Sequence, residues 1–161
     1  MKNKNNTKAL AVSGLFCALI YVTTMISIPM GTGYIHVGDA FIYIASCILP
    51  FPLCAFAAAV GGALSDLTLG YAVYAIPTFI IKFLNSLCIY IVCHNSKKLT
   101  RDISGAVLSG LVTTVGYYLA AVILFGGFVA QLHAIPGNIL QATASGVIFI
   151  LLKNVIIKKI K

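Results

Sequence analysis

The polar side chains that could bind a small molecule appear first in residues 31–40, which read Gly-Thr-Gly-Tyr-Ile-His-Val-Gly-Asp-Ala. This stretch is the first polar interruption in a very apolar chain. Tyr34, His36 and Asp39 can each form hydrogen bonds with a ligand. Because Asp39 immediately precedes an apolar segment, it could also cap the N-terminus of a helix. We therefore expect residues 31–40 to form a loop with a small-molecule site beside it.

Two further ionisable residues, Asp66 and Lys82, lie inside apolar segments. Ionisable groups within membrane segments are costly, and they usually pair or line a polar cavity. Since consecutive elements are usually neighbours, we expect a salt bridge between Asp66 and Lys82. Such a pair could fix the packing of two helices, border the ligand cavity, or do both.

Other candidate binding residues come from separate parts of the chain. Asn138 and Gln141 are three residues apart, so they share one face of a helix, although Asn138 could instead cap that helix. Their amides suit the hydrogen-bonding edge of a heterocycle, and Tyr74 could stack on its ring. The predicted substrate-binding residues are Tyr34, His36, Asp39, Asp66, Tyr74, Lys82, His133, Asn138 and Gln141.

The sequence indicates neither an enzyme nor a metal site. It contains no glutamate, no phosphate-binding Gly-x-x-x-x-Gly-Lys motif and no His-Glu-x-x-His motif. Its five cysteines lie in or beside apolar segments and match no metal-ligand or disulfide spacing. We therefore predict no catalytic residue, no metal and no cofactor.

The composition is that of an integral membrane protein. Of 161 residues, 60% are hydrophobic and 9% are charged, whereas soluble domains carry about 25% charged residues. The formal net charge is +8, but the basic residues cluster at segment ends, where they would meet anionic lipid headgroups. The charge is therefore not a sign of nucleic-acid binding.

Six apolar segments predict six membrane helices in a single domain covering residues 1–161. About 20 apolar residues span the hydrocarbon core of a bilayer. The first segment follows a basic start, as in a signal peptide, but it is too long and no Ala-x-Ala cleavage site follows. Pro50 and Pro52 should break the chain between the second and third helices. The expected helices are residues 9–28, 35–49, 53–69, 71–93, 103–125 and 136–152.

The distribution of charge predicts the topology of this all-α bundle. Basic residues cluster at the N-terminus, at residues 97–101 and at residues 153–161. The positive-inside rule places all three clusters in the cytoplasm, so even numbers of spans must separate them. Four spans before residue 97 and two after it satisfy this requirement. We therefore expect a multi-pass protein of the cell membrane with both termini in the cytoplasm.

In the order and spacing of its motifs, the chain resembles the substrate-binding S component of an energy-coupling factor (ECF) vitamin transporter. The resemblance spans nearly the whole chain. It is nearest to the riboflavin-type branch, and binders of pyridoxine or hydroxymethylpyrimidine are also compatible with it. It rests on the small-residue first helix after a basic start, Tyr34-Ile-His-Val-Gly-Asp39, Gly61-Gly-Ala-Leu-Ser-Asp66, Ile81-Lys82 and Pro136-Gly-Asn-Ile-Leu-Gln141.

The resemblance implies a six-helix bundle that captures a B-vitamin or its precursor outside the cell. It implies as partners a transmembrane coupling subunit and two ATPase subunits, and a first loop that acts as a lid. Small residues on the first helix, here Ala11, Gly14 and Ala18, would form the docking surface. The family's usual Ala-x-x-x-Ala is replaced by Gly14-x-x-x-Ala18, which leaves the docking positions open.

Two other functions remain compatible with the residues alone. One is a self-sufficient, oligomeric small-molecule transporter or channel, and the other is a structural membrane subunit without a ligand. A small molecule retained through purification would exclude the structural subunit.

Overall fold

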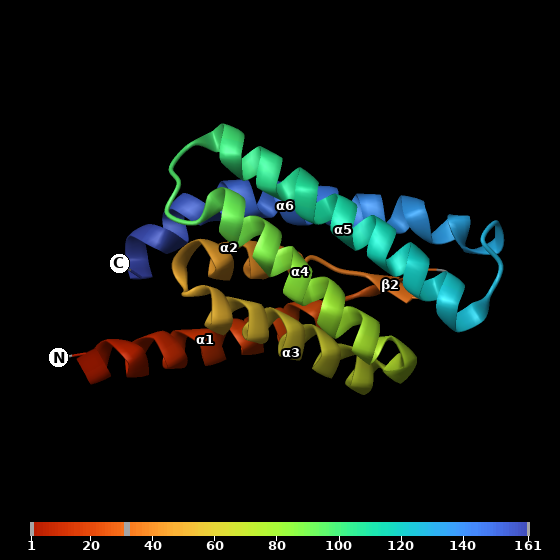
Figure 1. Cartoon of the computed structure of the whole chain (residues 1–161), viewed down its shortest axis with the longest axis horizontal. Helices are drawn as coiled ribbons and strands as arrows, with labels where there is room; N and C mark the ends of the chain where they lie inside the picture. Colours follow the sequence, from red (N-terminus) through yellow and green to blue (C-terminus); the bar gives the residue numbers. More distant parts are fainter. Residues whose placement is uncertain (1, 31–32, 161) are drawn as a thin grey trace.

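The computed structural model describes the backbone of residues 2–30 and 33–160 and the side chains of residues 6–30 and 33–156. Long helices dominate it and run side by side along one axis (Figure 1). The elements are α1 (Lys2–Met25), β1 (Ile28–Met30), β2 (Gly33–Ile35), α2 (Asp39–Ile48), α3 (Phe51–Leu69), η1 (Ala72–Tyr74), α4 (Ala75–Cys93), α5 (Leu99–Phe125), η2 (Ala130–His133) and α6 (Ala134–Ile160).

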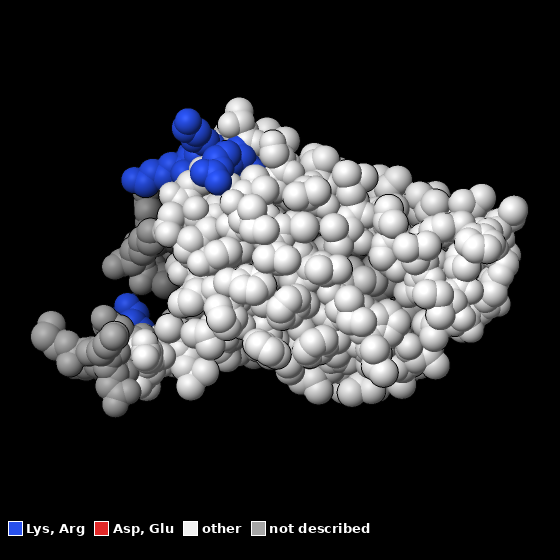
Figure 2. Space-filling view, in the orientation of Figure 1, with Lys and Arg blue, Asp and Glu red and all other residues white. Residues whose placement is uncertain are grey.

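Both ends of the chain lie at the same end of the bundle (Figure 1). The exposed Lys and Arg side chains visible in Figure 2 gather at this end, and no acidic side chain appears on the face shown. The described backbone thus brings three segments that lie far apart in the sequence, residues 2–8, 97–101 and 153–160, to one end of the bundle.

Five helices in the described part of the chain, α1 and α3 to α6, are long and apolar enough to cross a membrane. The expected helix at residues 35–49 is shorter in the structure, because α2 has ten residues and rises only about 15 Å. That length is roughly half of the hydrocarbon core. The prediction of six full-length spanning helices is therefore not confirmed, since the described residues contain five long helices and a short one.

The chain before α2 forms a two-stranded antiparallel hairpin, in which Pro29 lies opposite Tyr34. The helix predicted from residue 35 was wrong at this end. Ile28, Tyr34 and Ile35 favour extended backbone, and Pro29 is tolerated because both strands are edge strands. Gly38, whose added Cβ would lie 2.4 Å from the Thr24 hydroxyl, then begins the turn into α2. Residues 31–32 fall outside the described residues.

Two expected helix caps also differ from the structure. Asp39 is the first residue of α2, and its side chain makes no capping hydrogen bond. Asn138 lies inside α6, which begins at Ala134 rather than at Pro136, and its side-chain amide donates to the Ala134 carbonyl oxygen at 3.0 Å. The predicted break at Pro50 and Pro52 is confirmed, since α2 ends at Ile48 and α3 begins at Phe51.

Small residues allow the helices to pack closely around α2. The small residues of α3 at positions 57–63 are largely buried, and a Cβ on Gly61 would lie 2.8 Å from the Cys17 carbonyl oxygen of α1. A Cβ on Gly116 would likewise lie 2.8 Å from the Ile81 side chain. Close backbone approach of this kind stabilises membrane helix pairs. It holds α2, with eight buried residues, at the centre of the bundle.

Candidate binding site

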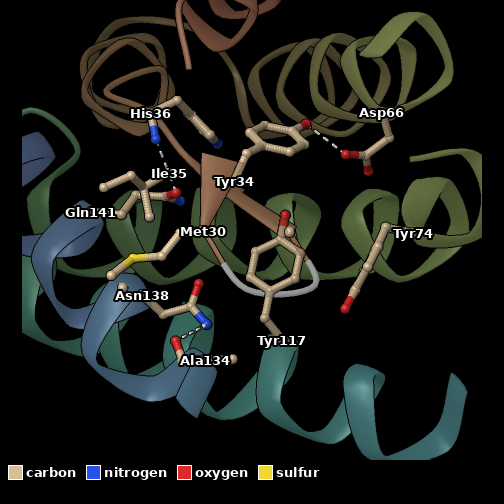
Figure 3. A pocket seen from close by; sticks show the side chains of 12 residues that line it. Met30, Tyr34, Ile35, His36, Asp66, Tyr74, Tyr117, Ala134, Asn138 and Gln141 are labelled. Atoms are coloured by element: carbon tan, nitrogen blue, oxygen red, sulfur yellow. Dashed lines mark hydrogen bonds between the residues drawn. The ribbon is translucent and has the colours of Figure 1, made fainter. Parts of the chain in front are cut away.

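A pocket lies at the end of the bundle opposite the chain termini, between the hairpin, the end of α3, α5 and the start of α6 (Figure 3). Its volume is about 50 Å³, which is enough for one or two waters. The lining residues are Met30, Gly33, Tyr34, Ile35, His36, Asp66, Tyr74, Tyr117, Ala134, Gly137, Asn138 and Gln141.

Asp66 provides the negative charge of this pocket. Its side chain is 3% exposed. The Tyr34 hydroxyl donates a hydrogen bond of 2.6 Å to Oδ1, whereas Oδ2 has no hydrogen-bond partner among the described groups. The pocket therefore contains a buried carboxylate oxygen that can still accept a hydrogen bond.

Three tyrosine rings surround the side of the pocket where Asp66 lies (Figure 3). The Tyr74 and Tyr117 ring centroids are 6.3 Å apart, and the Tyr117 hydroxyl lies 3.0 Å from the Thr78 hydroxyl. Tyr34 packs against Tyr71, with ring centroids 4.9 Å apart. These contacts fix the rings, so the pocket has a preformed aromatic wall.

His36 and Gln141 form the opposite wall, and both are buried. The Gln141 Oε1 accepts a hydrogen bond of 3.3 Å from the His36 backbone N–H. The His36 Nδ1 accepts one of 3.0 Å from the Gly38 N–H, which places the ring proton on Nε2. His36 can therefore donate a hydrogen bond from Nε2.

The salt bridge expected between Asp66 and Lys82 was wrong, because Lys82 pairs with Asp39 instead. The Lys82 ammonium donates to Asp39 Oδ1 at 2.6 Å, and the two side chains are 1% and 0% exposed. Gln141 Nε2 donates to Asp39 Oδ2 at 2.9 Å. Asp39 thus joins α2 to α4 and α6 directly behind the pocket, and Gln141 connects this network to the pocket wall.

Comparison with known proteins identifies the kind of membrane protein in which this pocket lies. The family model of the ECF-type riboflavin transporter S component matches residues 4–158. The chain belongs to this family. It is also similar to the "Uncharacterized protein in gap 3'region" of Pyrococcus woesei, with 34% identity over 134 residues, which cover 80% of this chain and 87% of that protein.

Membership in the family confirms several predictions made from the sequence. The chain is a membrane-embedded transport protein, not an enzyme. S components bind a small-molecule vitamin and work together with ECF subunits. The pocket is therefore the candidate vitamin site of this S component.

The S component brings most of the predicted binding residues together. Tyr34, His36, Asp66, Tyr74, Asn138 and Gln141 line the pocket. Asp39 and Lys82 lie behind it without lining it. His133 is exposed, with its Nδ1 2.6 Å from the Ala130 carbonyl oxygen, and it does not line the pocket.

The sequence did not indicate Met30 or Tyr117 as pocket residues. Tyr117 lies two turns from the end of a long apolar helix, where a tyrosine usually meets the membrane interface. Tyr117 lies four residues after Thr113, so the two polar residues share one face of the helix. Thr113 is buried in the structure, and this shared face could have indicated that Tyr117 points into the bundle. Met30 carries no such signal, because the hairpin that positions it was not predicted.

The first helix has an uncovered face of the kind expected for docking. Ala11, Gly14 and Ala18 are all exposed, and a Cβ added to Gly14 would meet nothing within 4 Å. The opposite face of α1 packs against the bundle through buried Phe16 and Ile20. The exposed Ala11, Gly14 and Ala18 therefore take no part in holding the S component together.

Proposed function

We propose that this protein captures a B-vitamin or vitamin precursor outside the cell for ATP-driven uptake by an ECF coupling subunit and two ATPase subunits. The ligand belongs to the riboflavin, pyridoxine or hydroxymethylpyrimidine class. The observation that carries the proposal is a buried polar and aromatic pocket at the end of the bundle away from the basic clusters. In a chain of the S component family, such a pocket suits a neutral or singly charged heterocycle.

The orientation of the pocket follows from the positive-inside rule. The basic clusters face the cytoplasm, so both termini are cytoplasmic and the pocket opens outward. The hairpin and α2 together make the second crossing, although α2 alone is too short. Polar backbone groups at membrane depth are tolerated here because protein surrounds them.

Ligand entry requires the hairpin to move. The cavity of about 50 Å³ is far below the roughly 300–1,000 Å³ of typical small-molecule sites. The hairpin contributes Met30, Tyr34 and Ile35 to the lining, and β1 is exposed along its length. We infer that outward movement of the hairpin enlarges the pocket and that its return covers the bound ligand.

The exposed face of α1 carries the second half of the function. Lipid supplies little hydrophobic drive between helices, so close backbone approach must hold a partner helix. Ala11, Gly14 and Ala18 allow that approach, and they lie along α1 rather than in the pocket. Docking and ligand binding therefore use separate surfaces.

The decisive experiment is native mass spectrometry of the protein purified in mild detergent. We expect one vitamin or vitamin precursor per chain, which denaturation releases for identification. A preparation that retains no small molecule and binds no riboflavin, pyridoxine or hydroxymethylpyrimidine compound in titration would contradict the proposed function.

A further inference from the structure

Asp66 is the one acidic residue of the chain without a cationic partner in the described structure. The chain has three acidic residues. Lys82 pairs with Asp39 at 2.6 Å, and Lys153 pairs with Asp102 at 2.5 Å. Asp66 makes neither contact, and its Oδ2 has no hydrogen-bond partner. The pocket therefore has a buried carboxyl group without an ion-pair partner among the described side chains.

Basic side chains of the protein cannot readily supply the missing charge. Lys82 is held by Asp39 at 2.6 Å, and its Nζ lies 5.3 Å from the Tyr117 ring centroid. The exposed basic side chains visible in Figure 2 lie at the other end of the bundle. Since an isolated carboxylate is costly to bury, a group that enters the pocket with a positive charge would be strongly favoured.

The walls beside Asp66 suit such a group. Tyr34, Tyr74 and Tyr117 present aromatic rings around the carboxylate side of the pocket (Figure 3). Ring faces attract cations, more strongly where water is excluded. The amides of Asn138 and Gln141 lie on the other side of the pocket (Figure 3), where they can bind the neutral polar edge of a ring.

We propose that the ligand is a small aromatic heterocycle with a single positive charge, which sits between Asp66 and the three tyrosines. This inference rests on the proposed function and narrows it, because it excludes neutral members of the proposed ligand class as the preferred substrate. The neutral end of the heterocycle contacts the Asn138 and Gln141 side.

Matched pairs of probes test the charge directly. Pyridoxamine carries an ammonium group where pyridoxine carries a hydroxyl group. The aminomethyl and hydroxymethyl forms of 4-amino-2-methylpyrimidine differ in the same way. We would titrate all four, with riboflavin as a large neutral probe, into the purified full chain at neutral pH. A charge-assisted hydrogen bond is worth about tenfold or more in affinity.

We expect the cationic member of at least one pair to bind about tenfold more tightly than its neutral partner. Asp66→Asn should abolish this preference, because it keeps the shape of the side chain and removes its charge. Tyr118→Phe is the control, since the Tyr118 hydroxyl donates to the Phe128 carbonyl oxygen outside the pocket. This variant should keep the preference of the wild type.

Several results would overturn the proposal. Neutral probes that bind as tightly as their cationic partners, tightest binding of riboflavin, no binding of any cationic probe, or an unchanged preference in Asp66→Asn each contradict it. The wild-type comparison decides the question even if Asp66→Asn does not fold. A neutral vitamin found in the purified protein would leave the proposed function standing and remove only this inference.

Discussion

Asp39 accepts hydrogen bonds from side chains of two other helices. These partners could not be assigned from the order of the helices in the sequence. The sequence places Asp66 and Lys82 on consecutive helices, which favoured a pair between them. Asp39 precedes the short helix α2, whose place at the centre of the bundle depends on packing rather than on chain order. The residue types of the network were therefore predictable, whereas the pairing depended on where α2 lies.

The Asp39–Lys82 ion pair predicts a non-additive pair of mutations. Breaking a buried pair on one side leaves an uncompensated charge, at a cost on the order of 3–5 kcal/mol. We expect Asp39→Asn to lower the free energy of unfolding by more than the double variant of Asp39→Asn with Lys82→Gln. Denaturant or thermal unfolding in detergent would measure the coupling, which is about 0.5–3 kcal/mol for contacting residues.

The control for this cycle is the pair that the sequence suggested. Asp66→Asn combined with Lys82→Gln should show a much smaller coupling, because Asp66 is hydrogen-bonded to Tyr34 and not to Lys82. Equal coupling energies in the two cycles would mean that Lys82 does not prefer Asp39.

The polar lining of the pocket was easier to predict than its shape. Tyr34, Asp66 and Gln141 are polar groups in or beside apolar segments, and such groups must face protein or a cavity. Tyr117 was missed because one tyrosine near a helix end resembles any interfacial tyrosine. Periodicity identifies a helix face, but it does not show which neighbouring element completes the wall.

At the scale of the elements, α1 combines a packed face and an open one. Its low sequence amphipathicity conceals this division, because both faces are apolar or small in a membrane helix. Phe16 and Ile20 are buried, while Gly14 and Ala18 remain exposed. The hairpin and the short α2 were predicted less well, since three-residue strands leave little periodic signal in an apolar sequence.

The open face of α1 gives a prediction that separates docking from ligand binding. Gly14→Leu or Ala18→Leu adds bulk where a partner helix would approach, and the space at Gly14 is empty in the isolated chain. We expect both variants to bind ligand with the wild-type affinity and to lose most uptake in cells that contain the partner subunits. Ligand titration and radiolabelled uptake measure the two effects.

Thr143→Leu is the matched control for the docking variants, since Thr143 is an exposed residue of another long helix, α6. It should affect neither ligand binding nor uptake. Loss of ligand binding in Gly14→Leu would show that this face supports the fold or the pocket, contrary to the separation proposed here.

At the scale of the whole molecule, hydropathy predicted the class and the long helices because the bilayer requires about 20 apolar residues per spanning helix. Five helices follow that rule. The segment at residues 35–49 departs from it, because β2 includes its first residue and α2 has only ten residues. The hairpin residues that precede α2 line the pocket. The error in the predicted helix at residues 35–49 therefore falls at the pocket.

The whole molecule also distinguishes an S component from a transporter that works alone. The polar pocket lies at the end of the bundle away from the exposed basic side chains, and the buried Asp39–Lys82 pair lies behind it. Concentrative uptake needs an energy source, and the chain has no nucleotide-binding motif.

We expect liposomes that contain the purified chain alone to bind ligand but not to accumulate it. Addition of the coupling subunit, both ATPase subunits and internal ATP should start uptake, and Gly14→Leu should prevent it. Accumulation by the wild-type chain without these partners would establish the self-sufficient transporter instead.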